Sequence, residues 1–134
     1  MKRINAEEAR RLAERILVQQ GAPAAHAHIQ ADLLIEAELR GYASHGLLRL
    51  PRIVERIGHG VADPRTRGNA RWTRRNHLDV DGCRGLGPVV ARAALDVASE
   101  RARADGVAVA CIRNNNHLGM LAWYAEYVAQ QGLV

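Results

Sequence analysis

Two adjoining stretches, Val107-Ala-Val-Ala-Cys-Ile112 and Asn114-Asn-Asn-His117-Leu-Gly119, decide the predicted fold. The first is a continuous apolar run with β-branched residues, which is typical of a strand buried on both faces of a sheet. The second predicts a polar turn over residues 114–116 that leads into a helix over residues 118–131. A buried strand joined to a helix indicates a protein of the α/β class.

The residues before this strand predict the rest of the sheet. Residues 71–73 and 77–80 each fit a short strand on either side of a turn, and residues 87–105 fit an Ala- and Arg-rich helix. This order of elements predicts a mixed sheet with flanking helices. Such a sheet is small for an independent domain, and an apolar pair that could open another strand stands at Leu133-Val134. We therefore expect a truncated sheet, the start of a longer one.

The first part of the chain is predicted to be helical. Asn5 is a good N-cap for a first helix. Apolar residues then recur at helical spacing, and they do so again in residues 23–40 and 44–58. We therefore expect residues 1–60 to form a helical N-terminal part. Residues 61–134 are expected to begin an α/β domain for cofactor and substrate, left incomplete.

The composition limits the class of protein. A chain of 134 residues that is 48% hydrophobic and 25% charged suits one globular domain. No apolar run approaches the roughly 18 residues of a membrane span, and no secretory h-region is visible, so we expect a cytoplasmic protein with no membrane partner. The two cysteines, Cys83 and Cys111, cannot make a disulfide framework or a four-thiolate zinc site. Cys111 is expected to be a buried small hydrophobe.

The charge balance raises the question of nucleic-acid binding. Nineteen basic residues against fourteen acidic ones give a net charge of +5. The densest basic stretch offers only Trp72 as a stacking ring, and a solvated loop and hairpin explains it as well. The stretch contains Arg65, Arg67, Arg71, Arg74 and Arg75. A non-catalytic basic module that binds nucleic acid or a protein partner therefore remains the alternative function.

One short motif carries residues suited to chemistry on a small acid. Ser44-His45-Gly46 is followed by Arg49, and on a helix His45 and Arg49 share one face. A histidine can shuttle a proton near neutral pH, and an arginine can hold a carboxylate by two parallel hydrogen bonds. This pair suits a 2-keto or 2-hydroxy acid. Alternatively, Ser44 caps a helix and the other two side chains are solvated.

A second motif is the segment Asn114–Gly119. It follows the carboxyl end of the predicted strand, where α/β proteins bind ligands, and a helix N-terminus there would favour an anion. The alternative is a polar turn with Asn116 as the N-cap.

Two further features are predicted to be structural, and one further function is ranked last. The stretch Gly82-Cys-Arg-Gly85-Leu-Gly87 departs from the dinucleotide pattern G-x-G-x-x-G, so its glycines are expected to serve a turn and close helix packing. His26 and His28 stand two residues apart on a helix and do not face the same way, so no metal site is expected. A Ser44–His45 hydrolase ranks last, because adjacent residues rarely point at one another and no G-x-S-x-G surrounds the serine.

Three motifs together resemble the malate/L-lactate dehydrogenase family of the non-Rossmann kind. They are Ser44-His45-Gly46-Leu-Leu-Arg49, Val80-Asp-Gly82 with Gly85-Leu-Gly87-Pro, and Asn114-Asn-Asn-His117-Leu-Gly119. The resemblance runs over essentially the whole chain, and the last motif looks closest to sulfolactate dehydrogenases. It implies an NAD- or NADP-dependent oxidoreductase that interconverts 2-keto and 2-hydroxy acids as a homodimer. It also implies an α/β fold with an N-terminal helical part.

The resemblance also implies roles for single residues. His45 resembles the proton donor, polarised by Ser44, and Arg49 resembles the clamp on the substrate carboxylate. His117 resembles a second pocket histidine, to which some members give the acid/base role. Family chains continue beyond Val134, so an N-terminal fragment, inactive by itself, is expected. The residues expected to lie against the dinucleotide are His117, Leu118, Gly119, Met120 and Leu121.

Overall fold

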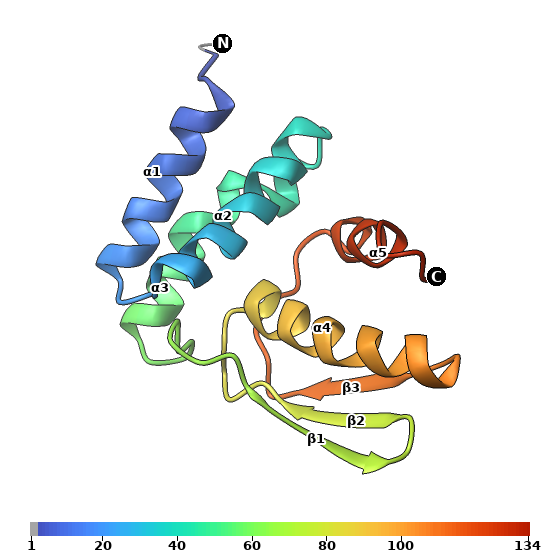
Figure 1. Ribbon diagram of the computed structural model, residues 1–134. Helices are drawn as coiled ribbons and strands as arrows, with labels where there is room; N and C mark the ends of the chain where they lie inside the picture. The colour runs from blue at the N-terminus through green and yellow to red at the C-terminus, as the bar shows by residue number, and fades with distance from the viewer. Residues whose placement is uncertain (1–2) are drawn as a thin grey trace.

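The computed structural model describes residues 3–134, so residues 1–2 of the predicted helical part lie outside the described residues. Helices and a three-stranded sheet follow one another along the chain (Figure 1). The helices are α1 (Ala6–Gln19), α2 (Ala24–Leu39), α3 (Leu50–Gly58), α4 (Gly87–Asp105) and α5 (Ala122–Ala129). The strands are β1 (Asn69–Arg74), β2 (His77–Asp81) and β3 (Val109–Arg113). Two short 3-10 turns, Ala43–His45 and Leu47–Arg49, precede α3.

The sheet is mixed, as predicted, with the strand order β1-β2-β3. The hairpin strands β1 and β2 are antiparallel, whereas β2 and β3 are parallel and pair Asp81 with Arg113 at one end. Helix α4 makes the crossover between the two parallel strands and lies on one face of the sheet (Figure 1). The carboxyl ends of β2 and β3 therefore meet at the same edge of the sheet, where the loops that follow them can touch.

The expected burial of the last strand on both faces is wrong. Ala110 and Ile112 are half-buried and pack with the core beneath α4, but Val109 and Cys111 are exposed. The reason is that helix α4 covers only one face of the sheet within residues 3–134 (Figure 1). Cys111 is therefore an exposed thiol and not the buried small hydrophobe expected from its apolar neighbours.

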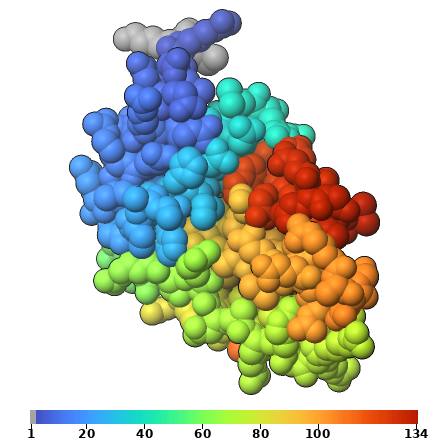
Figure 2. Space-filling view, in the orientation of Figure 1, coloured from blue at the N-terminus to red at the C-terminus, as the bar shows by residue number. Residues whose placement is uncertain are grey.

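Helix α2 lies at the centre of the helical part. The side chain of Asn5 caps α1 by accepting from the amides of Glu7 and Glu8, at 2.8 and 3.3 Å. One side of α2 packs against α1 and α3, and its Leu33 and Ala37 pack against α4 and α5. Figure 2 shows α5 lying against α2 and α4. This two-sided burial makes α2 the element that joins the helical part to the sheet.

Two predicted helix boundaries are wrong. The helix expected over residues 118–131 begins only at Ala122, since Gly119 adopts a φ of +77° that a helix cannot contain. The helix expected over residues 44–58 is broken into two 3-10 turns and α3, with Pro51 in the first turn of α3. Within residues 3–134, no helix has the length and apolarity needed to cross a bilayer.

Candidate functional site

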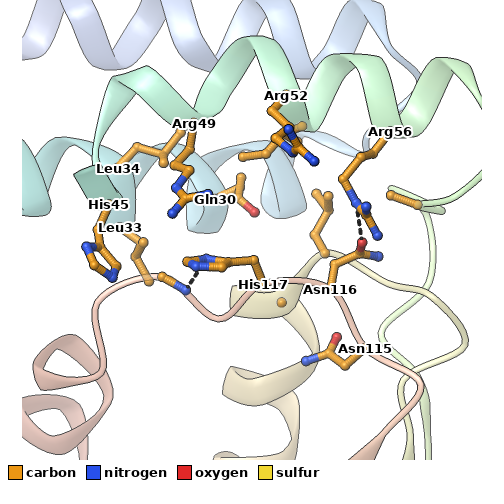
Figure 3. A pocket seen from close by; sticks show the side chains of 15 residues that line it. Gln30, Leu33, Leu34, His45, Arg49, Arg52, Arg56, Asn115, Asn116 and His117 are labelled. Carbon is orange, nitrogen blue, oxygen red and sulfur yellow. Dashed lines mark hydrogen bonds between the residues drawn. The ribbon is translucent and has the colours of Figure 1, made fainter. Parts of the chain in front are cut away.

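A cavity of about 290 Å³ opens between two segments that are distant in the sequence (Figure 3). One side, here called the helical wall, is formed by residues 44–56. The other side, the loop wall, is formed by residues 114–119 (Figure 3). The cavity is lined by Gln30, Leu33, Leu34, His45, Arg49, Arg52, Ile53, Arg56, Ala62, Leu86, Gly87, Asn115, Asn116, His117 and Gly119.

Helix α2 fixes the start of the helical wall. The carboxylate of Glu38 accepts a hydrogen bond from the amide of Leu47 at 2.8 Å. A Cβ atom at Gly46 would overlap this carboxylate, so only glycine fits between the two 3-10 turns without displacing it. The break in the predicted helix therefore follows from a tertiary contact of Gly46 and Leu47, which no local pattern reveals.

Hydrogen bonds join Ser44 to His45 and to Arg49 on this wall. The hydroxyl of Ser44 lies 3.0 Å from Nδ1 of His45, and Nε of Arg49 donates to the carbonyl of Ser44 at 2.7 Å. The expectation that adjacent serine and histidine side chains do not meet is therefore wrong. The two terminal nitrogens of Arg49 have no partner within the described residues, which leaves that edge of its guanidinium for an anion.

The glycine-rich stretch before α4 holds the loop wall in place. A Cβ atom at Gly87 would overlap the carbonyl of His117, and one at Gly82 would lie 2.8 Å from the carbonyl oxygen of Asn114. The side-chain amide nitrogen of Asn116 donates to the carbonyls of Arg84 and Gly85, at 2.6 and 3.0 Å. The predicted role of these glycines in close packing is confirmed, and the packing partner is the loop wall itself.

Asn116 does not cap a helix, because no helix begins there. Its side-chain oxygen instead accepts from Nε of Arg56 at 2.9 Å, which links the loop wall to the helical wall (Figure 3). The rings of His45 and His117 lie near each other at the cavity, with their centroids 5.8 Å apart and their planes tilted by 45°. Two histidines from different walls therefore reach the same small volume.

The two histidines differ in their hydrogen bonds. Nδ1 of His117 accepts from the amide of Gly119 at 2.9 Å, so the neutral ring carries its proton on Nε2. Partial burial, together with the positive charges of Arg49 and His45, lowers the pKa of His117 below its ordinary value of 6.5. At neutral pH His117 is thus a neutral ring whose Nε2–H can donate a hydrogen bond.

The cavity is cationic and has one polar atom without a partner. Arginines line it at three positions, and no aspartate or glutamate does so within residues 3–134. The side-chain oxygen of Asn115 is buried and accepts no hydrogen bond from the described part of the chain. Such a site suits a small anion that can also offer a hydrogen-bond donor.

Comparison with known proteins gives the family. The family model for malate/L-lactate dehydrogenase matches residues 4–134. The chain belongs to the malate/L-lactate dehydrogenase family.

Individual members of the family are similar over most of this chain. Malate dehydrogenase of Pyrococcus abyssi is 38% identical over 90% of the chain and 33% of its own length. L-sulfolactate dehydrogenase of Methanocaldococcus jannaschii is 31% identical over 96% of the chain and 37% of its own length. A dehydrogenase structure from Sinorhizobium meliloti is 50% identical with a TM-score of 0.95, covering 98% of this chain and 41% of that one. The chain thus spans about a third of the length of these curated relatives.

The cavity brings several of the site residues predicted from the sequence together. His45, Arg49, His117 and Gly119 line the cavity, and Ser44 supports it from behind. Three residues of the expected dinucleotide segment lie outside the lining. Leu118 is half-buried, Met120 is buried against α2 and Leu121 is exposed.

Among the polar residues of the lining, sequence reasoning missed Gln30, Arg52 and Arg56. The two arginines could have been found, because positions 49, 52 and 56 recur at helical spacing in the sequence. No pattern in the sequence indicates Gln30, since it lies on α2 and reaches the cavity only through tertiary packing.

The other histidines that could bind a metal ion do not form a site. His26 is buried with Nδ1 2.9 Å from the carbonyl of Pro64, whereas His28 lies beside Glu14. In residues 3–134 no group of three or more His, Cys, Asp or Glu side chains could hold a metal ion.

The basic stretch is largely paired with acids. Arg71 and Arg75 lie beside Asp79 and Asp105, respectively. The guanidinium of Arg101 covers the ring of Trp72 at 4.6 Å. The one aromatic ring of this stretch is therefore occupied within the protein, which weakens the nucleic-acid alternative.

Proposed function

We propose that the protein is a nicotinamide-dependent dehydrogenase that interconverts 2-keto and 2-hydroxy acids. The observation that carries the proposal is the convergence of Arg49 with His45 and His117 in one cavity that no acidic side chain of residues 3–134 lines. Family membership supports an oxidoreductase of this kind. Because the chain spans about a third of its relatives, this activity is proposed for the whole protein.

Arg49 is the proposed anchor for the substrate carboxylate. The bond from its Nε to the carbonyl of Ser44 holds the guanidinium in one orientation, and its terminal nitrogens can then bind both oxygens of a carboxylate. A carboxylate held there brings the adjacent keto oxygen towards the two histidines, whose rings are 5.8 Å apart.

His45 is the proposed proton donor. Its Nδ1 lies 3.0 Å from the hydroxyl of Ser44, which can accept a hydrogen bond from Nδ1–H and leave Nε2 to serve the substrate oxygen. In the reducing direction the oxygen takes the proton from His45 as the keto carbon is reduced. His117 has a lowered pKa, so it is better suited to donate a hydrogen bond from Nε2 to the same oxygen.

The proposed cofactor is a nicotinamide dinucleotide, NAD or NADP, and one polar atom of the cavity supports this proposal. The buried side-chain oxygen of Asn115 lacks a donor within the described residues, and a carboxamide N–H would supply one. The segment His117–Leu121 is proposed to lie along the dinucleotide, with Leu121 exposed at its end. When bound, the reduced cofactor supplies the hydride for the keto carbon.

The test is an absorbance assay on the full-length product of the natural gene. Loss of NADH or NADPH absorbance with pyruvate, oxaloacetate or sulfopyruvate is the expected result, and it also decides between the two cofactors. Residues 1–134 alone are expected to show little turnover, because they span about a third of the related enzymes. If the full-length protein oxidises neither cofactor with any of these acids, the proposed function is wrong.

The assembly and location follow the family resemblance. We propose a cytoplasmic homodimer in which residues 1–60 are the helical part and residues 61–134 begin the cofactor- and substrate-binding domain. Light scattering of the full-length protein tests the dimer. A strictly monomeric, active enzyme would contradict it.

A further inference from the structure

The cavity holds more positive charge than one carboxylate requires. Arg49, Arg52 and Arg56 follow one another at spacings of three and four residues, which places them along one side of the helical wall (Figure 3). All three line the cavity, and no carboxylate of residues 3–134 lines it with them. A monocarboxylate neutralises one of these charges and leaves the other two unbalanced.

The three arginines are not equivalent. Nε of Arg49 is bound by the carbonyl of Ser44, and Nε of Arg56 is bound by the side chain of Asn116. Arg52 makes no hydrogen bond or ion pair within the described residues. It is exposed and lies between Arg49 and Arg56 along the helical wall (Figure 3). Its guanidinium is therefore available to an anion that enters the cavity.

The spacing between Arg49 and Arg52 indicates which kind of anion the cavity binds. Residues three apart on a helical surface have Cβ atoms about 5–6 Å apart, so Arg49 and Arg52 can each hold one end of a short chain with two acidic groups. A guanidinium binds carboxylate and sulfonate oxygens alike through paired hydrogen bonds. A second acidic group on the carbon next to the keto group would thus be directed from Arg49 towards Arg52.

We propose that Arg52 binds the second acidic group of a dianionic 2-keto acid and makes the protein prefer diacids to pyruvate. This inference rests on the proposed function, since it needs Arg49 to hold the first carboxylate. Arg52 is then a specificity-determining residue. A substrate that carries only one acidic group does not need it.

The experiment compares Arg52→Gln, Arg52→Lys and the natural full-length protein. Oxaloacetate and 3-sulfopyruvate are the diacids, and pyruvate is the matched monoacid. Arg11→Gln is the control, because Arg11 is an exposed arginine of α1 that lies outside the cavity lining. Thermal unfolding checks that each variant is folded, and malate binding by calorimetry gives a readout independent of turnover.

Arg52→Gln is expected to raise KM for a diacid at least about tenfold and to weaken malate binding similarly. KM for pyruvate should stay within about twofold, and Arg52→Lys should fall between Arg52→Gln and the natural protein. An effect on only one diacid would support the proposal and identify the second group as carboxylate or sulfonate.

Equal losses for pyruvate and the diacids, no loss at all, or a rise confined to KM for NAD(P)H would overturn the role of Arg52. The proposed function would survive each of these results, since the natural protein would still reduce 2-keto acids. If the natural protein reduces none of the acids, both proposals fall together.

Discussion

The two walls of the cavity are held in different ways. The helical wall is one continuous stretch, residues 44–56, and its arginines are placed by helical spacing and by a bond to the nearby carbonyl of Ser44. The loop wall, residues 114–119, is held by the glycine stretch 82–87, which lies far from it in the sequence. The spacing of the arginines is thus set by local structure, while Glu38 of α2 and Asn116 of the loop wall hold the helical wall at its two ends. The gap between the histidines is set by long-range packing of the backbone.

The histidines provide the sharpest comparison of the walls. His45→Asn in the full-length enzyme should lower kcat at least about a hundredfold with little change in NAD(P)H affinity, because it removes the proposed proton donor. His117→Asn should disturb both kcat and NAD(P)H affinity, because its segment is proposed to lie against the dinucleotide. Steady-state kinetics and NAD(P)H titration of both variants measure this difference.

An opposite pattern would exchange the two roles. A near-normal kcat in His45→Asn, with a collapsed kcat and intact NAD(P)H binding in His117→Asn, would make His117 the proton donor.

The glycine stretch tests how the loop wall is held. In Gly87→Ala the added methyl group would overlap the carbonyl of His117, which is backbone and cannot turn away. We expect a loss of about 1–3 kcal/mol in the free energy of unfolding, as for an overpacked core, together with reduced kcat. Urea unfolding and kinetics of the full-length protein measure both.

Gly58→Ala is the matched control. Gly58 lies in α3, and a Cβ atom there meets nothing within 4 Å. This change should stabilise the protein slightly or leave it unchanged, since alanine is the better helix former by about 1 kcal/mol. If the two substitutions have the same effect, the loop wall does not depend on the close approach at Gly87.

Part of the fold could be predicted from the sequence alone. The mixed sheet and most helices were predictable, because apolar periodicity and turn residues are local signals. The burial of β3 and the start of α5 were not, since the covering of one sheet face and the conformation of Gly119 depend on tertiary contacts. A Cβ atom at Gly119 would overlap Leu33 of α2, which no spacing within residues 114–131 indicates.

The candidate site shows the same division. His45, Arg49 and His117 were found by chemistry and by family resemblance, and the cavity brings them together. The hydrogen bond from Arg56 to Asn116 was missed, because it joins residues 60 positions apart in the chain.

The smallest expected effect is electrostatic. The pKa of His117 lies below 6.5 through partial burial and the charges of Arg49 and His45, so removing one charge in Arg49→Gln should raise it. The folded state disfavours the imidazolium form of His117, so the neutral ring favours folding. This contribution to the free energy of unfolding is present above the unfolded-state pKa of His117 and is lost as the pH falls through its folded-state pKa. NMR titration of His117 measures its pKa. If the pKa of His117 does not rise in Arg49→Gln, the charge of Arg49 on the helical wall does not act on His117 of the loop wall.

Arg49 on the helical wall is proposed to anchor the substrate carboxylate. Arg49→Lys keeps the charge but loses the planar fork, so KM for the 2-keto acid should rise by the equivalent of about 1.5–3 kcal/mol. KM for NAD(P)H should stay nearly constant. Steady-state kinetics of this variant in the full-length enzyme, with each substrate varied in turn, is the most direct test. An unchanged KM for the 2-keto acid with a raised KM for NAD(P)H would show that Arg49 binds the cofactor and not the substrate carboxylate.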